Sequence, residues 1–258
     1  MKLETFMTNV RKAETPFYAR LNRAARRCVS FEAPVVPVWH GFLYREHQLR
    51  YHLWRDFWRA FYYQPMFRTR CESCGKGLYI YHSGQGIPYI IGDLSISIGD
   101  NVKIFDRSAL AGLTVGARSQ LAIGDNTEIP SPISIFVANE VTIGANCLIV
   151  SSFIADNPGH TMNYKTRLAE RVDIERVGAV KIGDFVWAAH SSMIIGNVTV
   201  GAGAVIAASA VVTKDVPPFC VVAGNPARLV KKLPFPEEMR RRLGEEQYRS
   251  YEEAELRP

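Results

Sequence analysis

The sequence predicts an all-β solenoid with an α-helical extension before it and a helical tail after it. Three features support this fold class: a six-residue aliphatic period, turn-forming residues between its members, and one polar interruption. In the C-terminal half the period runs through Ile182, Ala188, Ile194, Val200, Ile206 and Val212. A fixed short period is typical of proteins in which similar coils stack on one another.

A second set of small or β-branched residues follows the first set by four positions. Its members are Val186, Ser192, Val198, Ala204, Ala210 and Val216. An earlier block repeats the pattern, with Ile98, Ile104 and Leu110 in the first set and Val102 and Ser108 in the second. One unit provides a short strand and a tight corner, and three units close a triangular coil. We expect both sets to point inward and Gly, Asp and Asn to form the corners.

The repeat extends from about residue 86 to 224, with register slips near residues 113, 122 and 140. Residues 155–179 interrupt it over too great a length for a slip, so we interpret them as an excursion from the column. A polar loop on a rigid scaffold is a frequent location for function.

The segments outside the repeat are expected to be helical. Before it, we predict helices over roughly 5–28 and 41–63, separated by Pro34 and Pro37, with the second helix ended by Pro65. We expect these helices to cap or flank one end of the solenoid, because open strand edges promote aggregation.

The tail begins a helix at Pro236, which is followed by two glutamates. We expect the tail to cap or strap the other end. The predicted organisation is an N-terminal extension over 1–70, a solenoid domain over 71–233 and a tail over 234–258.

Composition restricts the class of protein. The chain has 258 residues, 47% of them hydrophobic and 22% charged, with no apolar run of the roughly 18–20 residues that cross a bilayer. It begins without a secretion signal, and its five cysteines are mostly scattered, so we predict a reduced, cytoplasmic protein. Cys71-Glu-Ser-Cys74 lacks a second pair, so we expect no metal. The net charge of +6 agrees with an anionic partner.

Four segments resemble the hexapeptide-repeat acyltransferases, and most closely the maltose, galactoside and surface-polysaccharide O-acetyltransferases. They are Ile182-Gly-Asp-Phe-Val-Trp187, the run from Ile194 to Ile206, Ala208-Ser-Ala-Val-Val-Thr-Lys-Asp-Val-Pro-Pro218 and Ala223-Gly-Asn-Pro-Ala-Arg228. The resemblance covers about residues 86–232. It implies a left-handed parallel β-helix, although parallel crossovers are normally right-handed. It also implies a homotrimer with active sites between adjacent subunits and acetyl-CoA as acyl donor.

The start of the excursion resembles the catalytic loop of this family. Relatives have a pattern like Ile-x-Asp-x-x-His, and Ile154-Ala-Asp-Asn-Pro-Gly-His160 is similar with one additional residue. This implies His160 as the general base, a role that suits a neutral imidazole removing a hydroxyl proton. Asp156 is one candidate to orient the ring, and a backbone carbonyl is the other. A solvent-exposed loop residue is the alternative interpretation of His160.

Three further residues are assigned to the acceptor side: Trp187, His190 and Asn163. Trp187 is too large for the interior, so we expect it to point outward and to line the cleft or pack at the trimer interface. His190 lies at a corner and either contacts the acceptor or is exposed to solvent.

Coenzyme A would lie along stacked small residues with its phosphates near a basic cluster. We assign its binding to Gly201, Ala202, Ala207, Ala208, Ser209, Lys214, Arg228 and Lys231. Residues 41–63 are rich in aromatic and basic residues, and they either cap the column or contact a membrane surface on its inner face.

The leading hypothesis is an O-acetyltransferase that moves an acetyl group from acetyl-CoA to a sugar hydroxyl of a surface polysaccharide, its precursor or a glycolipid. N-acylation of an amino sugar is the second. A γ-carbonic-anhydrase-like protein would need three zinc histidines, and only His160 and His190 lie in the solenoid, with His82 upstream. A noncatalytic scaffold is the last alternative. No nucleic-acid partner is predicted.

Overall fold

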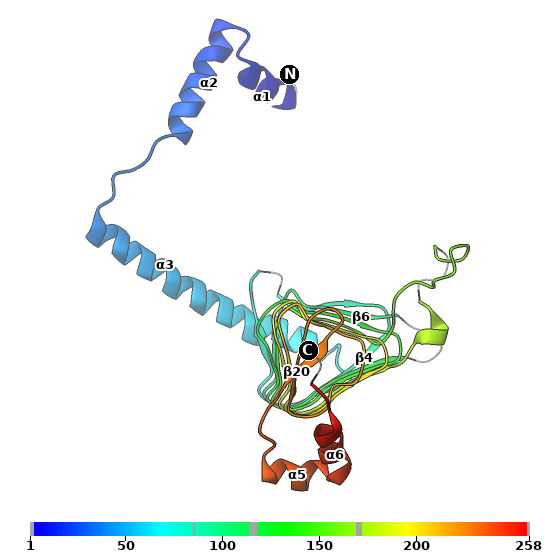
Figure 1. The fold of residues 1–258 in the computed structure, drawn as a ribbon. Coiled ribbons are helices and arrows are strands. Elements are labelled where there is room, and N and C mark those ends of the chain that lie inside the picture. The colour runs from blue at the N-terminus through cyan, green and yellow to red at the C-terminus, as the bar shows by residue number, and fades with distance from the viewer. Residues whose placement is uncertain (1–2, 85, 114–117, 169–171, 257–258) are drawn as a thin grey trace. The chain divides into compact units, whose positions relative to one another are not determined.

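The computed structural model describes residues 3–84, 86–113, 118–168 and 172–256. The chain divides into two compact units, Met1–Leu53 and Trp54–Pro258. In the second unit the chain passes through three sheets in turn, so that each strand pairs with strands of the coils before and after it (Figure 1). This is the three-sided stack of parallel coils that the six-residue period predicts.

The three sheets contain the following strands. Sheet A consists of β1 (Ser73–Cys74), β4 (Leu94–Ile98), β7 (Ser119–Ile123), β10 (Glu140–Ile143), β13 (Ala179–Ile182) and β16 (Val198–Val200). Sheet B consists of β2 (Tyr79–Tyr81), β5 (Lys103–Phe105), β8 (Glu128–Ile129), β11 (Leu148–Ile149), β14 (Trp187–Ala188), β17 (Val205–Ile206), β19 (Cys220–Ala223) and β20 (Arg228–Lys232). Sheet C consists of β3 (Tyr89–Ile91), β6 (Ala109–Gly112), β9 (Ser134–Val137), β12 (Phe153–Ala155), β15 (Met193–Ile195) and β18 (Val211–Val212).

The core lies inside the column and consists of the two predicted sets. Every member of both sets is buried, and none is more than 4% exposed. Successive coils stack these side chains in register, as in Ile143 beside Ile182 and Ile182 beside Val200. The inward direction of both sets is therefore confirmed.

Many corners use the expected residue types, and others use serine, at Ser151, Ser191 and Ser209, or phenylalanine. Asn101, Asn126 and Asn146 have φ of 56°, 55° and 57°, in the left-handed region that asparagine tolerates better than most residues. Phe185 and Phe219 occupy the same region, with φ of 60° and 53°, and nothing in the period indicated them.

The column begins one coil earlier than the period suggests. Ile80 pairs with Ile104 and is fully buried, so residues 73–91 already form a coil. Its last corner, between Tyr81 and Tyr89, is longer than six residues allow, which hides this coil from a periodicity search. The slip expected near residue 113 adjoins residues 114–117, which lie outside the described residues.

The N-terminal helices are more finely divided than predicted. They are α1 (Leu3–Lys12), α2 (Pro16–Val29), α3 (Pro37–Trp58), a π-helical turn (Arg59–Tyr63) and α4 (Gln64–Arg68). The single helix expected over 5–28 is wrong, because Ala13 takes a φ of 52° and Thr15 caps a new helix. Pro65 does not end the helical region. It lies in the first turn of α4, where a missing N–H costs little.

The ends of the column are covered by different elements. At the N-terminal end Phe67 of α4 is fully buried in the core. At the C-terminal end β20 pairs antiparallel with β19. The tail forms α5 (Glu237–Leu243) and α6 (Glu245–Glu253), which begin after Pro236 as predicted but are separated by Gly244.

The tail is attached to the side of the column. The Tyr251 hydroxyl donates to the Leu233 carbonyl at 2.9 Å, and Arg242 contacts Asp184 at 2.5 Å. Within the described residues no helix is both long enough and apolar enough to cross a membrane.

We predict that Phe67→Ala destabilises the second unit by about 3–5 kcal/mol, because it removes a fully buried ring from the end of the core. Phe61→Ala is the matched control, since Phe61 is 74% exposed and should change stability by about 0.5 kcal/mol or less. Denaturant unfolding of the two variants measures the difference. Equal midpoints would show that Phe67 does not close the column.

Candidate active site

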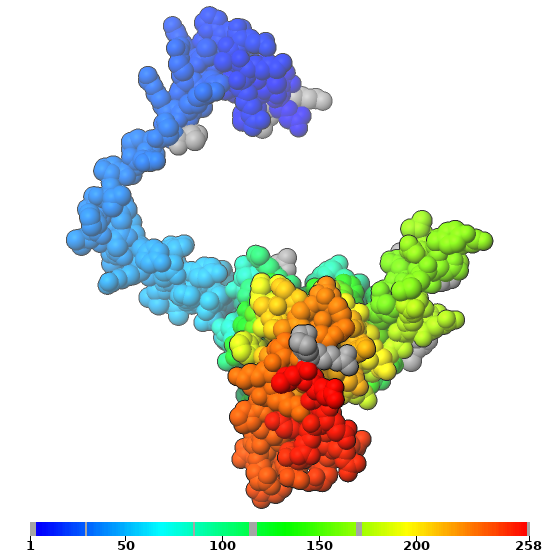
Figure 2. All heavy atoms as spheres, in the orientation of Figure 1, coloured from blue at the N-terminus to red at the C-terminus, as the bar shows by residue number. Residues whose placement is uncertain are grey.

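The site is built around the excursion between β12 and β13, which includes a short 3-10 turn at Ile174–Arg176. Its described part stands out from the column as the yellow-green arm in Figures 1 and 2. It leaves sheet C directly after Ala155, so its first residues are still attached to the coil.

Asp156 anchors the root of the excursion to the preceding coil. Its carboxylate is fully buried and accepts hydrogen bonds from the backbone N–H groups of Ala138, Asn139 and Glu140 at 2.8, 2.6 and 2.8 Å. The Asn157 side chain donates a fourth at 2.9 Å. Asp156 is therefore placed to hold the corner of the coil rather than to face the loop.

His160 is oriented by a backbone carbonyl. Its Nδ1 lies 2.9 Å from the carbonyl oxygen of Arg167, across the loop. A carbonyl can only accept, so in the neutral ring Nδ1 carries the proton and Nε2 carries the lone pair. Of the two candidates considered for orienting the ring, the structure brings the carbonyl to it and commits the Asp156 carboxylate to backbone donors.

The tip of the loop is held by local hydrogen bonds. The Arg167 guanidinium donates to the carbonyls of Thr161 and Met162 at 3.3 and 3.0 Å. Asn163 accepts from the Lys165 N–H through its side chain at 3.1 Å and from the Arg167 N–H through its carbonyl at 3.0 Å. Asn163 thus shapes the turn that carries the partner of His160.

An apolar pocket of about 590 Å³ opens beside His160 on the outer face of sheet C. Its lining comes from β9, β12 and β15 and from the loop, and includes Phe136, Phe153, Met193, Ile195 and Leu168. The Phe136 and Phe153 rings lie 5.4 Å apart. An apolar pocket next to a base is suited to group transfer between two bound molecules.

The sequence analysis missed this lining, although a signal was present. Phe136, Phe153 and Met193 occupy outward positions of their strands, where an apolar residue indicates a covered surface or a binding surface. The Arg167 carbonyl had no sequence signal, because any residue could supply that group.

Trp187 and His190 lie elsewhere on the chain. Trp187 points outward from sheet B, as predicted, and is 48% exposed. His190 is exposed at the corner that follows β14, where its carbonyl accepts from the Ser209 N–H at 3.0 Å. Within one chain neither residue lies on the face that carries His160.

The residues assigned to coenzyme A fall into three places. Ala207, Ala208 and Ser209 form the corner after β17, and Arg228 and Lys231 lie on β20. Gly201 and Ala202 form the corner after β16, and Lys214 follows β18 at the third corner. The first group and β20 lie on either side of β19: the Ala207 N–H donates to the Val222 carbonyl, and Arg228 pairs with Ala223.

The two half-buried cysteines near the start of the column are poor ligands. Burial, together with neighbouring Cys74, raises the pKa of Cys71 to about 12, so its thiol stays protonated at neutral pH. In the part of the chain that the structure describes, no three His, Cys, Asp or Glu side chains are grouped to hold a metal ion.

A histidine–carboxylate pair, His82 with Asp106, lies at the first coil. The Asp106 carboxylate is buried and contacts His82 Nδ1 at 3.0 Å, the Ser83 hydroxyl at 2.8 Å and the Gly86 N–H at 3.1 Å. Burial acts to raise the pKa of Asp106, but these hydrogen bonds outweigh it and the pKa is lowered. Like Asp156, Asp106 is a buried carboxylate that accepts hydrogen bonds from backbone N–H groups. It thereby stabilises the long corner between Tyr81 and Tyr89.

Residues 179–214 match the model of the bacterial transferase hexapeptide family, described by its six repeats. The chain thus contains a segment with the repeats of that family. It is 36% identical over 109 residues to a chloramphenicol acetyltransferase of Escherichia coli, covering 36% of this chain and 52% of that protein. It is 29% identical over 150 residues to a putative lipopolysaccharide biosynthesis O-acetyl transferase, WbbJ, of Escherichia coli K12, covering 56% and 75%.

The chain spans about half the length of the first curated relatives that it matches. Its fold is similar to that of AntD, an N-acyltransferase from Bacillus cereus solved with dTDP and 3-hydroxybutyryl-CoA. The TM-score is 0.53 and the identity 21%, over 73% of this chain and 96% of AntD.

We predict that Asp156→Ala destabilises the second unit by about 2–4 kcal/mol, because three backbone N–H groups at a buried corner lose their acceptor. Asp93→Ala is the matched control, since its ion pair with Arg118 is exposed and worth about 0–1 kcal/mol. Thermal unfolding compares them. If both variants unfold at the wild-type temperature, Asp156 does not anchor the excursion.

Proposed function

We propose that this chain is an acetyl-CoA-dependent O-acetyltransferase that modifies a sugar hydroxyl of a surface polysaccharide, its precursor or a glycolipid. The transferase unit is residues 71–233, wound as a left-handed β-helix. The observation that carries the proposal is the hydrogen bond from His160 Nδ1 to the Arg167 carbonyl, beside the apolar pocket of sheet C.

The chemistry needs one base. Nε2 of His160 takes the proton from the sugar hydroxyl while the oxygen attacks the thioester carbonyl carbon. The tetrahedral intermediate then collapses, the carbon–sulfur bond breaks, and the departing thiolate takes up the proton from the imidazolium. A positioned general base contributes on the order of 10²–10⁴-fold to such a reaction.

A homotrimer would complete the site. Sheet A has a largely polar outer face, as in the row Ser97, Ala122, Thr142, Lys181 and Thr199. Sheet B instead presents the apolar row Leu148, Trp187, Val205 and Val221. If sheet B of one subunit faces sheet C of its neighbour, Trp187 meets the His160 pocket across the interface. This arrangement would explain why Trp187 and His160 are exposed on different faces of one chain, since the two residues would meet only between neighbouring subunits.

The donor would enter from the C-terminal side. Ala207, Ala208 and Ser209 present a narrow corner that admits an extended arm, and Arg228 and Lys231 on β20 supply cations for its phosphates. Acetyl-CoA as donor is proposed on this basis and on the family.

We predict that His160→Ala lowers kcat by about 10²–10⁴-fold, because the base is removed while the coil remains anchored through Asp156. Thiol release from acetyl-CoA is measured with a panel of maltose, galactosides and bacterial polysaccharide fragments. His47→Ala is the matched control, since His47 is exposed on α3. Light scattering checks that both variants keep the wild-type mass. Undiminished turnover in His160→Ala would contradict the assignment.

We also propose that the helical segment over 41–63 contacts a membrane surface. Trp54, Phe57 and Phe61 lie three and four positions apart on one helix face and are 63%, 49% and 74% exposed. The basic residues Arg55 and Arg59 point to another side, where both contact Asp56. In the first unit, α2 has four arginines and no acidic residue, which suits anionic headgroups.

We predict that the full chain floats with vesicles of phosphatidylglycerol and phosphatidylethanolamine, and that a Trp54→Ser, Phe57→Ser, Phe61→Ser variant stays at the bottom of the gradient. The reason is the loss of three aromatic side chains from the lipid interface. Phosphatidylcholine vesicles are the control for charge. Equal flotation of the variant would reject this contact.

A further inference from the structure

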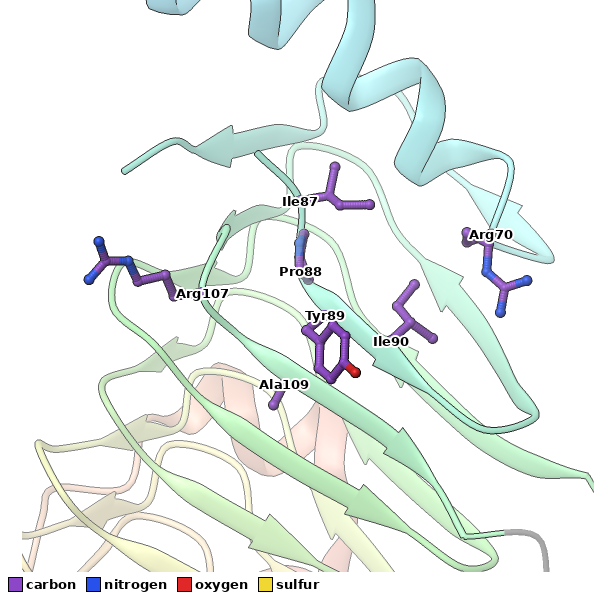
Figure 3. Close-up of a pocket in the computed structure, with 7 residues that line it drawn as sticks. All are labelled: Arg70, Ile87, Pro88, Tyr89, Ile90, Arg107 and Ala109. Atoms are coloured by element: carbon purple, nitrogen blue, oxygen red, sulfur yellow. The ribbon is translucent and has the colours of Figure 1, made fainter. Parts of the chain in front are cut away.

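A second pocket lies at β3, the edge strand of sheet C, at the N-terminal end of the column. It has a volume of about 770 Å³ and is lined by Arg70, Ile87, Pro88, Tyr89, Ile90, Arg107 and Ala109 (Figure 3). Three parts of the chain build it: the turn after α4, the strand β3 with its approach, and the corner between β5 and β6. Its floor is apolar, and its walls carry the polar groups.

Among the residues that the structure describes, the only charged side chains that line this pocket are two arginines. Arg70 and Arg107 are exposed and flank Tyr89 from opposite sides in Figure 3. Among the described residues neither makes an ion pair or a side-chain hydrogen bond, in contrast to Arg118, which pairs with Asp93. Two uncompensated guanidinium groups make this pocket attractive to an anionic group.

Tyr89 adds a surface for a ring. Its side chain is 66% exposed, although it occupies a strand position whose neighbour on β6 is the small Ala109. An exposed aromatic face with a hydroxyl at its edge can contact the apolar side of a sugar and bond to its hydroxyls. A bare inorganic anion would need neither the ring nor the apolar floor.

The pocket is connected to the His160 pocket along the same sheet. The outward row runs from Tyr89 through Ala109, Ser134 and Phe153 to Met193, in register on successive coils. Tyr89 and Ala109 line the pocket that contains Arg70 and Arg107, which we call the arginine pocket. Phe153 and Met193 line the His160 pocket. At about 4.8 Å between strands, the two pairs of residues are centred roughly 14 Å apart, a length that a short oligosaccharide spans.

We propose that Arg70 and Arg107 form an acceptor subsite that binds an acidic sugar unit of a glycan chain lying along sheet C. This proposal rests on the proposed transfer function, because it defines the class of acceptor. The carboxylate or phosphate of one sugar is held between the arginines, its ring rests on Tyr89, and a unit further along the chain places its hydroxyl at His160. The acceptor thus approaches from the N-terminal side and the donor from the C-terminal side.

Binding without turnover tests the subsite. The probes are tetrasaccharides of galacturonic acid, glucuronic acid and sialic acid and a phosphosugar tetrasaccharide, each compared with the same chain after its acidic groups are esterified. Calorimetry with the full-length protein should show at least one acidic chain binding about 10-fold or more tightly than its ester. Arg70→Gln with Arg107→Gln should remove that preference and flatten the salt dependence.

The matched control is Arg241→Gln with Arg249→Gln, which makes the same charge change on exposed positions of α5 and α6. It should retain the preference for the acidic chain. The proposal is overturned if no acidic chain binds better than its ester, or if both double variants lose the preference equally. It is also overturned if dTDP or pyrophosphate binds more tightly than every glycan and only the Arg70, Arg107 variant loses it, since that outcome assigns the pocket to a nucleotide.

These outcomes are separate from failure of the transfer function. His160→Ala should bind the acidic tetrasaccharide as the wild type does, because His160 lies outside the arginine pocket. Absence of any preference for the acidic chains in the wild-type protein, with normal turnover on neutral sugars, rejects the subsite alone. Normal turnover in His160→Ala with glycan preference intact rejects the base alone.

Discussion

Stacking of each coil directly on the coil before it is the constraint on which the rest of this structure depends. Strands of two to five residues cannot satisfy their backbone groups alone, so every N–H and C=O must meet a partner one coil away. The distance between coils is therefore fixed by strand pairing at about 4.8 Å, and the interior has room only for residues of limited size. This is why aliphatic and small residues alternate inside, and why Trp187 has to point outward.

The same constraint decides where the chain can leave the column. A departure in the middle of a strand would break the pairing above and below it, whereas a departure at a corner leaves the sheets intact. The excursion leaves after β12, and Asp156 replaces the lost strand contacts with hydrogen bonds to Ala138, Asn139 and Glu140 of the coil below. Asp106 does the same for the long corner of the first coil, through Ser83 and Gly86. A buried corner aspartate is thus the device that allows a long loop without loss of register.

Sequence predicted the parts of the molecule that this constraint controls. The inward sets, the corner asparagines and the position of the excursion all follow from the period, since each coil repeats the same physical requirement. The six-residue period did not reveal the first coil, because its corner before Tyr89 is long. It did not reveal the break in the helix at Ala13 either, because a single left-handed residue has no periodic signal. The hydrogen-bond partner of His160 could not be predicted for a different reason. It is the backbone carbonyl of Arg167, and a residue of any type supplies such a group. Asp156 was correctly singled out, but its contacts show an anchoring role that the loop pattern did not distinguish from ring orientation.

Outward positions are free of the stacking constraint, so their chemistry has to be explained by what binds there. Sheet A is largely polar, sheet B carries an apolar row through Trp187, and sheet C changes along its length from two arginines and a tyrosine to phenylalanine and methionine. Core packing cannot account for that change, because the inward side chains of the same strands are uniformly aliphatic. An acceptor that is charged at one end and presents a hydroxyl at the other would explain it. On this view the stacked interior fixes an equal spacing between successive coils. The outward side chains of sheet C then determine which sugar unit of the acceptor lies at His160.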